Sequence, residues 1–152
     1  MGNPSTKEYT DQEEERYLIY DKTMMISEKV VNYISGECPD IKKLKYADKY
    51  EGKVPSIILC IVRSRAEDDL RTYINGDIGN ESRLLIIFIH ACVKGVDPRP
   101  LISAKTFQSQ SATNILYSSI GLKIYKCKTN KNARKETKAW LSKTTKGNII
   151  QI

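Results

Sequence analysis

His90 and Cys92 are the residues best suited, by type and spacing, to nucleophilic chemistry. Two positions apart in a strand, a thiol and the imidazole that would activate it share one face. We identify no third side chain that would orient the imidazole as a base. His90 also lies in the most apolar stretch of the chain, residues 84–93, where a buried, hydrogen-bonded histidine is the commoner finding. The pair therefore does not predict a cysteine hydrolase.

Carboxylates offer a second chemistry, because Glu67, Asp68, Asp69 and Glu81 could hold a metal ion for a small nuclease. The first turn of a helix explains three of these acids better, since the helix dipole favours negative charge there. The sequence contains no phosphate-binding loop, no G-x-G-x-x-G and no G-x-S-x-G. One histidine and four widely spaced cysteines do not form a zinc pattern. We therefore expect no enzyme, no cofactor and no metal.

Charge is the stronger signal. The net charge is +7, but its distribution is uneven. Residues 1–28 contain seven acids and three bases, whereas residues 123–152 contain nine bases and one acid. Such asymmetry indicates either polyanion binding by the basic end or head-to-tail contact between copies of the chain.

Two segments supply the candidate cations for a membrane or nucleic-acid surface. The C-terminal candidates are Lys123, Lys126, Lys128, Lys131, Arg134, Lys135 and Lys138. A loop over residues 38–53, in which Tyr46 and Tyr50 are interleaved, adds Lys42, Lys43, Lys45 and Lys49. Lysine and arginine bind anionic lipid head groups and nucleic-acid phosphates alike. A solvated basic face remains the simpler alternative.

The N-terminus begins Met1-Gly2 and matches M-G-x-x-x-[ST], the pattern for myristoylation of Gly2. One myristoyl chain binds membranes weakly without a second, basic signal, which the C-terminal region would provide. Met1-Gly2 as a cloning remnant is the alternative. No secretory signal is recognised, so reduced thiols in a cytosolic compartment are expected.

The elements that must position these cations centre on two apolar stretches, residues 54–62 and 84–93. Both are rich in β-branched residues without polar alternation, which predicts strands covered on both faces. A helix between them begins at a capping-box sequence, Ser64–Glu67. The two strands could be parallel with a right-handed crossover, or antiparallel.

The remaining segments carry weaker patterns. They predict a flexible tail over residues 1–15, one or two strands at 17–20 and 24–26, and a helix at Glu28–Ser35 capped by Ser27. A half-exposed strand is predicted at 120–127, with Ile120, Leu122 and Ile124 inward and Lys123 outward. A second helix follows, capped by Asn132 and buried along Ala133, Thr137, Trp140 and Leu141, and residues 149–152 predict an edge strand. Residues 107–119 predict no element. The fold class is a single α+β domain over residues 16–152, with a mixed or antiparallel sheet of about four to six strands and two or three short helices.

Two short segments resemble the central part of rhabdovirus matrix proteins. They are Ile61-Val62-Arg63-Ser64 with Leu70-Arg71-Thr72-Tyr73, and Asn114-Ile115-Leu116-Tyr117 with Leu122-Lys123-Ile124-Tyr125. The resemblance covers the middle half of the chain and implies an α+β fold, self-association, and bridging between nucleocapsid and membrane. The acidic N-terminus departs from the family's Lys-rich tail, the Pro-rich budding motif is missing, and the chain is short for the family.

Together these observations predict a viral matrix-like structural protein, peripheral on membranes in the virion and host cytoplasm. Its expected partners are an anionic membrane surface, the viral nucleocapsid or RNA, and further copies of itself. A soluble viral RNA-binding accessory protein is the alternative hypothesis, and a small metal-dependent nuclease is a third.

Overall fold

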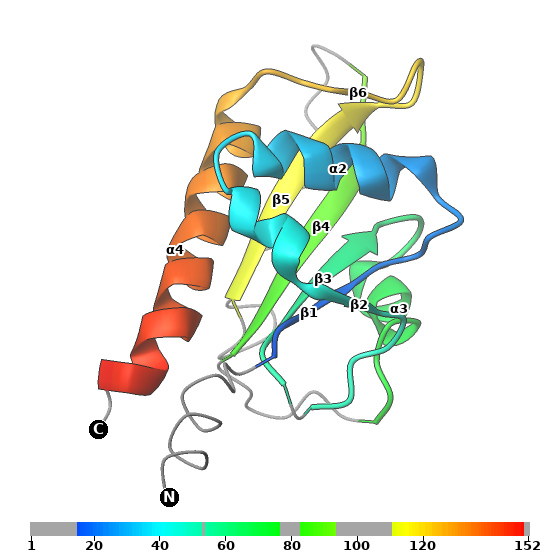
Figure 1. The fold of residues 1–152 in the computed structure, drawn as a ribbon. Helices are drawn as coiled ribbons and strands as arrows, with labels where there is room; N and C mark the ends of the chain where they lie inside the picture. Colours follow the sequence, from blue (N-terminus) through cyan, green and yellow to red (C-terminus); the bar gives the residue numbers. More distant parts are fainter. Residues whose placement is uncertain (1–14, 53, 77–82, 94–110, 151–152) are drawn as a thin grey trace, which may run out of the picture.

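A computed structural model describes residues 15–52, 54–76, 83–93 and 111–150, with residues 145–150 described by their backbone only. The chain forms a single-domain α+β fold built on one mixed six-stranded sheet of order β2-β1-β3-β4-β5-β6 (Figure 1). The first five strands in this order are parallel, and β6 is antiparallel to β5. The predicted tail of residues 1–15 and Gly2 fall, except for Glu15, outside the described residues.

The two apolar stretches form the centre of the sheet, as predicted. β3 spans Ser56–Ile61 and β4 spans Leu84–Ala91. All of β3 and the first six residues of β4 are buried. The strands are parallel, with Ser56 opposite Leu84 and Ile61 opposite Ile89, so of the two predicted arrangements the parallel one is confirmed.

The side chains of these strands alternate between two apolar layers. One layer contains Ile57, Leu59, Ile87 and Ile89, and it packs against helices α2 (Met25–Ser35) and α4 (Lys128–Ile150). The other contains Ile58, Cys60, Ile86 and Phe88, and it packs against the region of α3 (Ala66–Arg71). Figure 1 shows α2 and α4 over one face of the sheet and α3 on the opposite face. This arrangement explains why neither strand shows polar alternation.

The N-terminal part departs from prediction in where its helix begins. β1 spans Tyr17–Ile19, within the predicted strand. The predicted strand at residues 24–26 is wrong, because α2 begins at Met25. Ser27 is not the cap: it is fully buried inside the helix, and Met24 precedes it without a side-chain capping bond. Ile26, Val30 and Ile34 form a buried stripe, so the apolar face of this helix begins before Glu28, its predicted first residue.

The residues after α2 form a short 3-10 helix, η1 (Pro39–Lys43), and an edge strand, β2 (Lys45–Ala47). The sequence predicted only a loop there. β2 pairs with β1 in parallel register, with Tyr46 opposite Leu18. Its three residues carry no apolar alternation that would mark a strand.

Helix α3 forms as predicted, but its capping differs. Arg65 precedes the helix and no side chain caps it, so the predicted Ser64 capping box is wrong. Instead Asp69 Oδ2 accepts hydrogen bonds from the backbone N–H groups of Arg63 (2.6 Å) and Ser64 (3.1 Å). An acid inside the helix thus fixes the turn that leads out of β3.

The C-terminal part shows the largest departures. β5 (Ser111–Ser118) occupies part of the segment for which the sequence predicted no element, and it pairs with β4 along seven residues. β6 is only Lys123–Ile124, because Gly121 and Leu122 adopt left-handed φ angles of 77° and 50° and turn the chain. The predicted strand at 120–127 is therefore too long, and Ile120 is 86% exposed where it was predicted inward.

Helix α4 is long, not short. It begins at Lys128, four residues before the predicted cap Asn132, and runs to Ile150. The predicted edge strand at 149–152 is thus wrong for its first two residues, and residues 151–152 are outside the described part. The predicted stripe of Ala133, Thr137, Trp140 and Leu141 is buried against the sheet, as expected.

Candidate polyanion-binding surface

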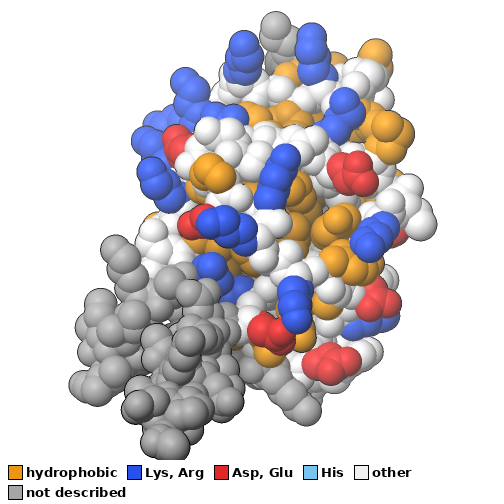
Figure 2. All heavy atoms as spheres, viewed as in Figure 1, with side chains coloured by type: hydrophobic (Ala, Val, Ile, Leu, Met, Phe, Trp, Pro, Cys, Tyr) orange, Lys and Arg blue, Asp and Glu red, His pale blue; other side chains and the backbone are white. Residues whose placement is uncertain are grey.

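The exposed side of α4 carries a row of lysines that we call the lysine stripe: Lys128, Lys131, Lys135 and Lys138. Spacings of three, four and three residues place them on one side of a helix. All four side chains are exposed. Ten residues of helix extend about 15 Å, so the stripe is a straight row of four cations of that length. Figure 2 shows basic side chains gathered along the margin of the molecule where α4 lies in Figure 1.

Buried contacts on the opposite side hold the helix in place. The Asn130 side chain accepts a hydrogen bond from Leu116 N (2.7 Å) and donates to Leu116 O (2.9 Å) and Tyr125 O (2.7 Å). A fully buried amide with three such bonds fixes the start of α4 against β5. Trp140 and Leu141 anchor the helix further along in the apolar layer. The lysines therefore project from a backbone whose position is set by the core.

Acidic residues do not neutralise the stripe within the described part of the chain. The acid of α4 among these residues, Glu136, receives a short hydrogen bond from the hydroxyl of Thr113 on β5. None of the ion pairs recorded there includes a lysine of the stripe. The stripe therefore keeps its four charges available for an external anion.

Two further predicted cations extend this surface. Lys123 in β6 and Lys126 after it are exposed, so the prediction that Lys123 points outward is confirmed. Ile124, predicted to be buried, is only half-buried. An open groove of about 720 Å³ lies beside Lys123, and it is also bordered by Lys29 and Tyr33 of α2 and by the turn that exposes Ile120. The sequence did not indicate Lys29 as a candidate cation, although the helical spacing of the buried Val30 and Ile34 places it on the solvent-exposed side of α2.

Arg134 is the exception among the predicted C-terminal cations. It is half-buried, and its Nε donates a hydrogen bond of 2.9 Å to Tyr33 O of α2. Its guanidinium carbon lies 3.8 Å from the centre of the Tyr33 ring. A Cβ added to Gly36 would come within 3.1 Å of its Nη2, so the packing is tight. The expectation that Arg134 is a solvated cation was wrong: it joins α4 to α2, because a planar guanidinium can stack and donate at once.

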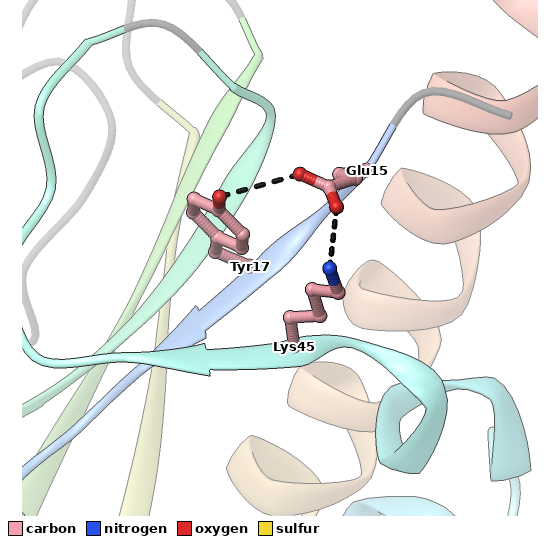
Figure 3. Close-up of polar contacts among 3 residues, drawn as sticks. All are labelled: Glu15, Tyr17 and Lys45. Atoms are coloured by element: carbon pink, nitrogen blue, oxygen red, sulfur yellow. Dashed lines mark hydrogen bonds and ion pairs between the residues drawn. The ribbon is translucent and has the colours of Figure 1, made fainter. Parts of the chain in front are cut away.

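The basic loop differs, because three of its four candidate lysines already have partners. Lys43 lies 3.3 Å from Asp40, and Lys49 Nζ donates to Thr72 O at 2.9 Å. Lys45 Nζ lies 2.6 Å from Glu15, whose other oxygen accepts a 3.3 Å hydrogen bond from Tyr17 (Figure 3). This contact with Lys45 lowers the pKa of Glu15.

The rest of this loop offers little to a polyanion. Lys42 is exposed. The predicted stacking residues are engaged elsewhere, since Tyr50 is buried in the second apolar layer and Tyr46 contacts Tyr20 edge-on at 5.0 Å. The loop therefore brings no second row of free cations to the surface formed by β6 and α4.

The residues considered for catalysis have local roles. His90 Nε2 lies 2.8 Å from Asn114 Oδ1 on the neighbouring strand, and burial lowers its pKa. Asp68 lies 4.0 Å from Arg71 within α3, and Asp69 fixes the turn after β3. Among the described residues no group of three or more His, Cys, Asp or Glu side chains could hold a metal ion.

No protein-family model, curated protein or solved structure matches this chain. No helix in the described ranges is both long and apolar enough to cross a bilayer.

Proposed function

We propose that this protein is a non-enzymatic, matrix-like structural protein that holds an anionic partner on the lysine stripe and the adjoining Lys123 and Lys126. The observation that carries the proposal is a straight row of four exposed lysines, on a helix docked by its other side, with the nearby acid Glu136 turned to Thr113. In this role the protein associates with itself and lies between nucleocapsid and anionic membrane, in the virion and the host cytoplasm.

The expected strength follows from the number of cations. Each lysine near an anionic membrane contributes about 1 kcal/mol, so four together give about 4 kcal/mol. On single-stranded RNA, four phosphate contacts give a slope of about −3 for the logarithm of affinity against the logarithm of salt concentration. Both interactions weaken as salt rises, because the charges are exposed and screened.

The deciding experiment reverses the stripe. A variant with Lys128, Lys131, Lys135 and Lys138 changed to Glu should lose about a thousandfold or more in affinity for anionic liposomes or RNA. A matched variant with the same positions changed to Gln should lose binding without added repulsion. Neither set touches the buried side of α4, so the thermal midpoint should change little. If the Glu variant binds with wild-type affinity, the lysine stripe is a solvated face and does not contact the anion.

The identity of the anion separates the two candidate functions. Flotation with phosphatidylserine liposomes and gel shifts with RNA should be run side by side on the wild type and the Glu variant. Loss of liposome binding in the Glu variant, with or without loss of RNA binding, supports the matrix-like role. Loss of RNA binding alone in the Glu variant favours a soluble viral RNA-binding accessory protein, which a straight row of cations also suits, because a nucleic-acid backbone is a linear array of charges.

Self-association and the absence of turnover are separate parts of the proposal. Sedimentation velocity at rising protein concentration should show oligomers, whereas a monomer at all concentrations contradicts the matrix-like role.

RNA incubated with the protein and Mg²⁺ should stay intact. Cleavage that disappears in an Asp68→Asn variant would establish a nuclease instead.

A further inference from the structure

A pocket of about 430 Å³ lies at the carboxyl ends of β1 and β3, apart from the lysine stripe. These neighbouring strands continue to opposite faces of the sheet, β1 toward α2 in one apolar layer and β3 toward α3 in the other. Where the connections diverge in this way, an open sheet leaves a crevice between them, and such crevices bind ligands in doubly wound folds. The topology therefore singles out this pocket among the hollows of the surface.

Tyrosine rings form one part of the pocket lining. Tyr20 and Tyr46 contact each other edge-on, with ring centres 5.0 Å apart, and Tyr73 lies mostly buried beside them. The face of Tyr46 already carries a cation, since Lys22 Nζ lies 3.9 Å from its ring centre. The ring face thus has the position and electron density that an ammonium group requires.

Carboxylates form the other part, and two of them are held in place. Asp21 Oδ1 accepts hydrogen bonds from Thr23 N (2.9 Å) and Thr23 Oγ1 (2.6 Å), and these bonds lower the pKa of Asp21, so it is ionised at neutral pH. Asp69 is fixed by the two backbone N–H groups after β3. In each of these two carboxylates, one oxygen accepts the hydrogen bonds from the chain itself. Asp48 is the third acid of the lining.

The cations of the lining differ from these acids in mobility. Lys22 and Arg63 are exposed side chains with several rotatable bonds. A lysine that leaves the Tyr46 ring gives up only a weak, solvated contact. The fixed charge of the pocket is therefore negative, even though the chain as a whole is basic.

We propose that this pocket binds a small organic cation, whose ammonium or guanidinium group replaces Lys22 on the Tyr46 ring and pairs with Asp21 and Asp69. The aromatic face and the carboxylates supply the two contacts that such a cation prefers. An anion of similar size would meet three carboxylates instead, and it would have to recruit both mobile cations.

The test uses the full chain and two probes, spermidine for alkylammonium and acetylarginine amide for guanidinium, each titrated by calorimetry and by NMR shifts of the tyrosine rings. At least one probe should bind saturably at one site. Asp21→Asn keeps an oxygen for Thr23 but removes the charge, and it should weaken binding about tenfold. Tyr46→Leu should weaken binding about two- to fivefold, whereas Tyr46→Phe should retain it.

Lys22→Ala is the most discriminating variant. It removes the internal competitor, so it should strengthen binding of the cation about two- to fivefold. Asp40→Asn, an acid outside the pocket, and the Glu variant of the lysine stripe should both bind the probe as the wild type does. Weaker binding in Lys22→Ala, saturable binding of inorganic phosphate in place of both cations, or no saturation by either probe would overturn the assignment.

Discussion

Two basic segments of this chain look alike in sequence and behave differently in the structure. Four closely spaced lysines of the loop over residues 38–53, Lys42, Lys43, Lys45 and Lys49, compare with the four of the lysine stripe on helix α4. In the loop, Lys43, Lys45 and Lys49 are each bonded to a partner on the protein. On α4 the lysine stripe is exposed and has no recorded ion pair in the described part of the chain. The difference teaches that a run of cations stays available to an external anion only where the rest of the fold does not supply its partners.

Arg134 gives the sharpest test of this distinction, because it lies beside the stripe and yet is engaged. Arg134→Ala should lower the free energy of unfolding by about 2 kcal/mol, through loss of the bond to Tyr33 O and of the stacking on its ring. Chemical denaturation measures this loss. Arg134→Lys keeps the charge but not the planar fork, so it should restore only part of the stability. Weakened RNA or liposome binding at unchanged stability would place Arg134 with the stripe after all.

Charge reversal in the loop is the matched control for the stripe. Changing Lys42, Lys43, Lys45 and Lys49 to Glu should reduce affinity for RNA or liposomes by only about three- to tenfold, through the long-range change in net charge. The same number of charges is altered as in the stripe variant, so position alone separates the two results. Equal losses of affinity in the two variants, measured at physiological salt, would contradict the distinction between the loop and the lysine stripe.

A loop lysine that loses its partner on the protein should bind an external anion slightly better, as the lysines of α4 are proposed to do. Glu15→Gln removes the partner of Lys45 and should raise affinity for a polyanion by about twofold at low salt. The gain should vanish in the double variant Glu15→Gln with Lys45→Gln. An unchanged affinity in Glu15→Gln would mean that even unpaired loop lysines lie outside the contact.

The smallest effect concerns acid titration of the same pair. The pKa of Glu15 is lowered from its ordinary value of 4.5, first by the hydrogen bond from Lys45. A carboxylate with a lowered folded-state pKa stabilises the protein above pH 4.5, and that contribution is lost as the pH falls through the folded-state pKa. In Lys45→Met, NMR titration should show the pKa of Glu15 rising back toward 4.5. A pKa that stays low without Lys45 would contradict the pairing in Figure 3.

The sequence by itself determined the elements whose signal is local. Unbroken β-branched runs identified β3 and β4, since a strand covered on both faces has no reason to alternate. The apolar stripe of Ala133, Trp140 and Leu141 identified the buried side of α4. Charge counts located the C-terminal cations, because a charged lysine side chain prefers water wherever the rest of the chain lies.

Only the tertiary structure decided features that depend on distant contacts. β5 contains the polar Thr113 and Asn114, so its sequence does not resemble a central strand. The side chain of Thr113 bonds to Glu136 of α4, and that of Asn114 bonds to His90 of β4. Arg134 is half-buried and bonded whereas its neighbour Lys135 is exposed, because Tyr33, about a hundred residues earlier in the chain, contacts Arg134. The pocket between β1 and β3 follows from strand order. Local patterns report which residues prefer water, whereas partners brought from elsewhere in the chain decide which charges remain free.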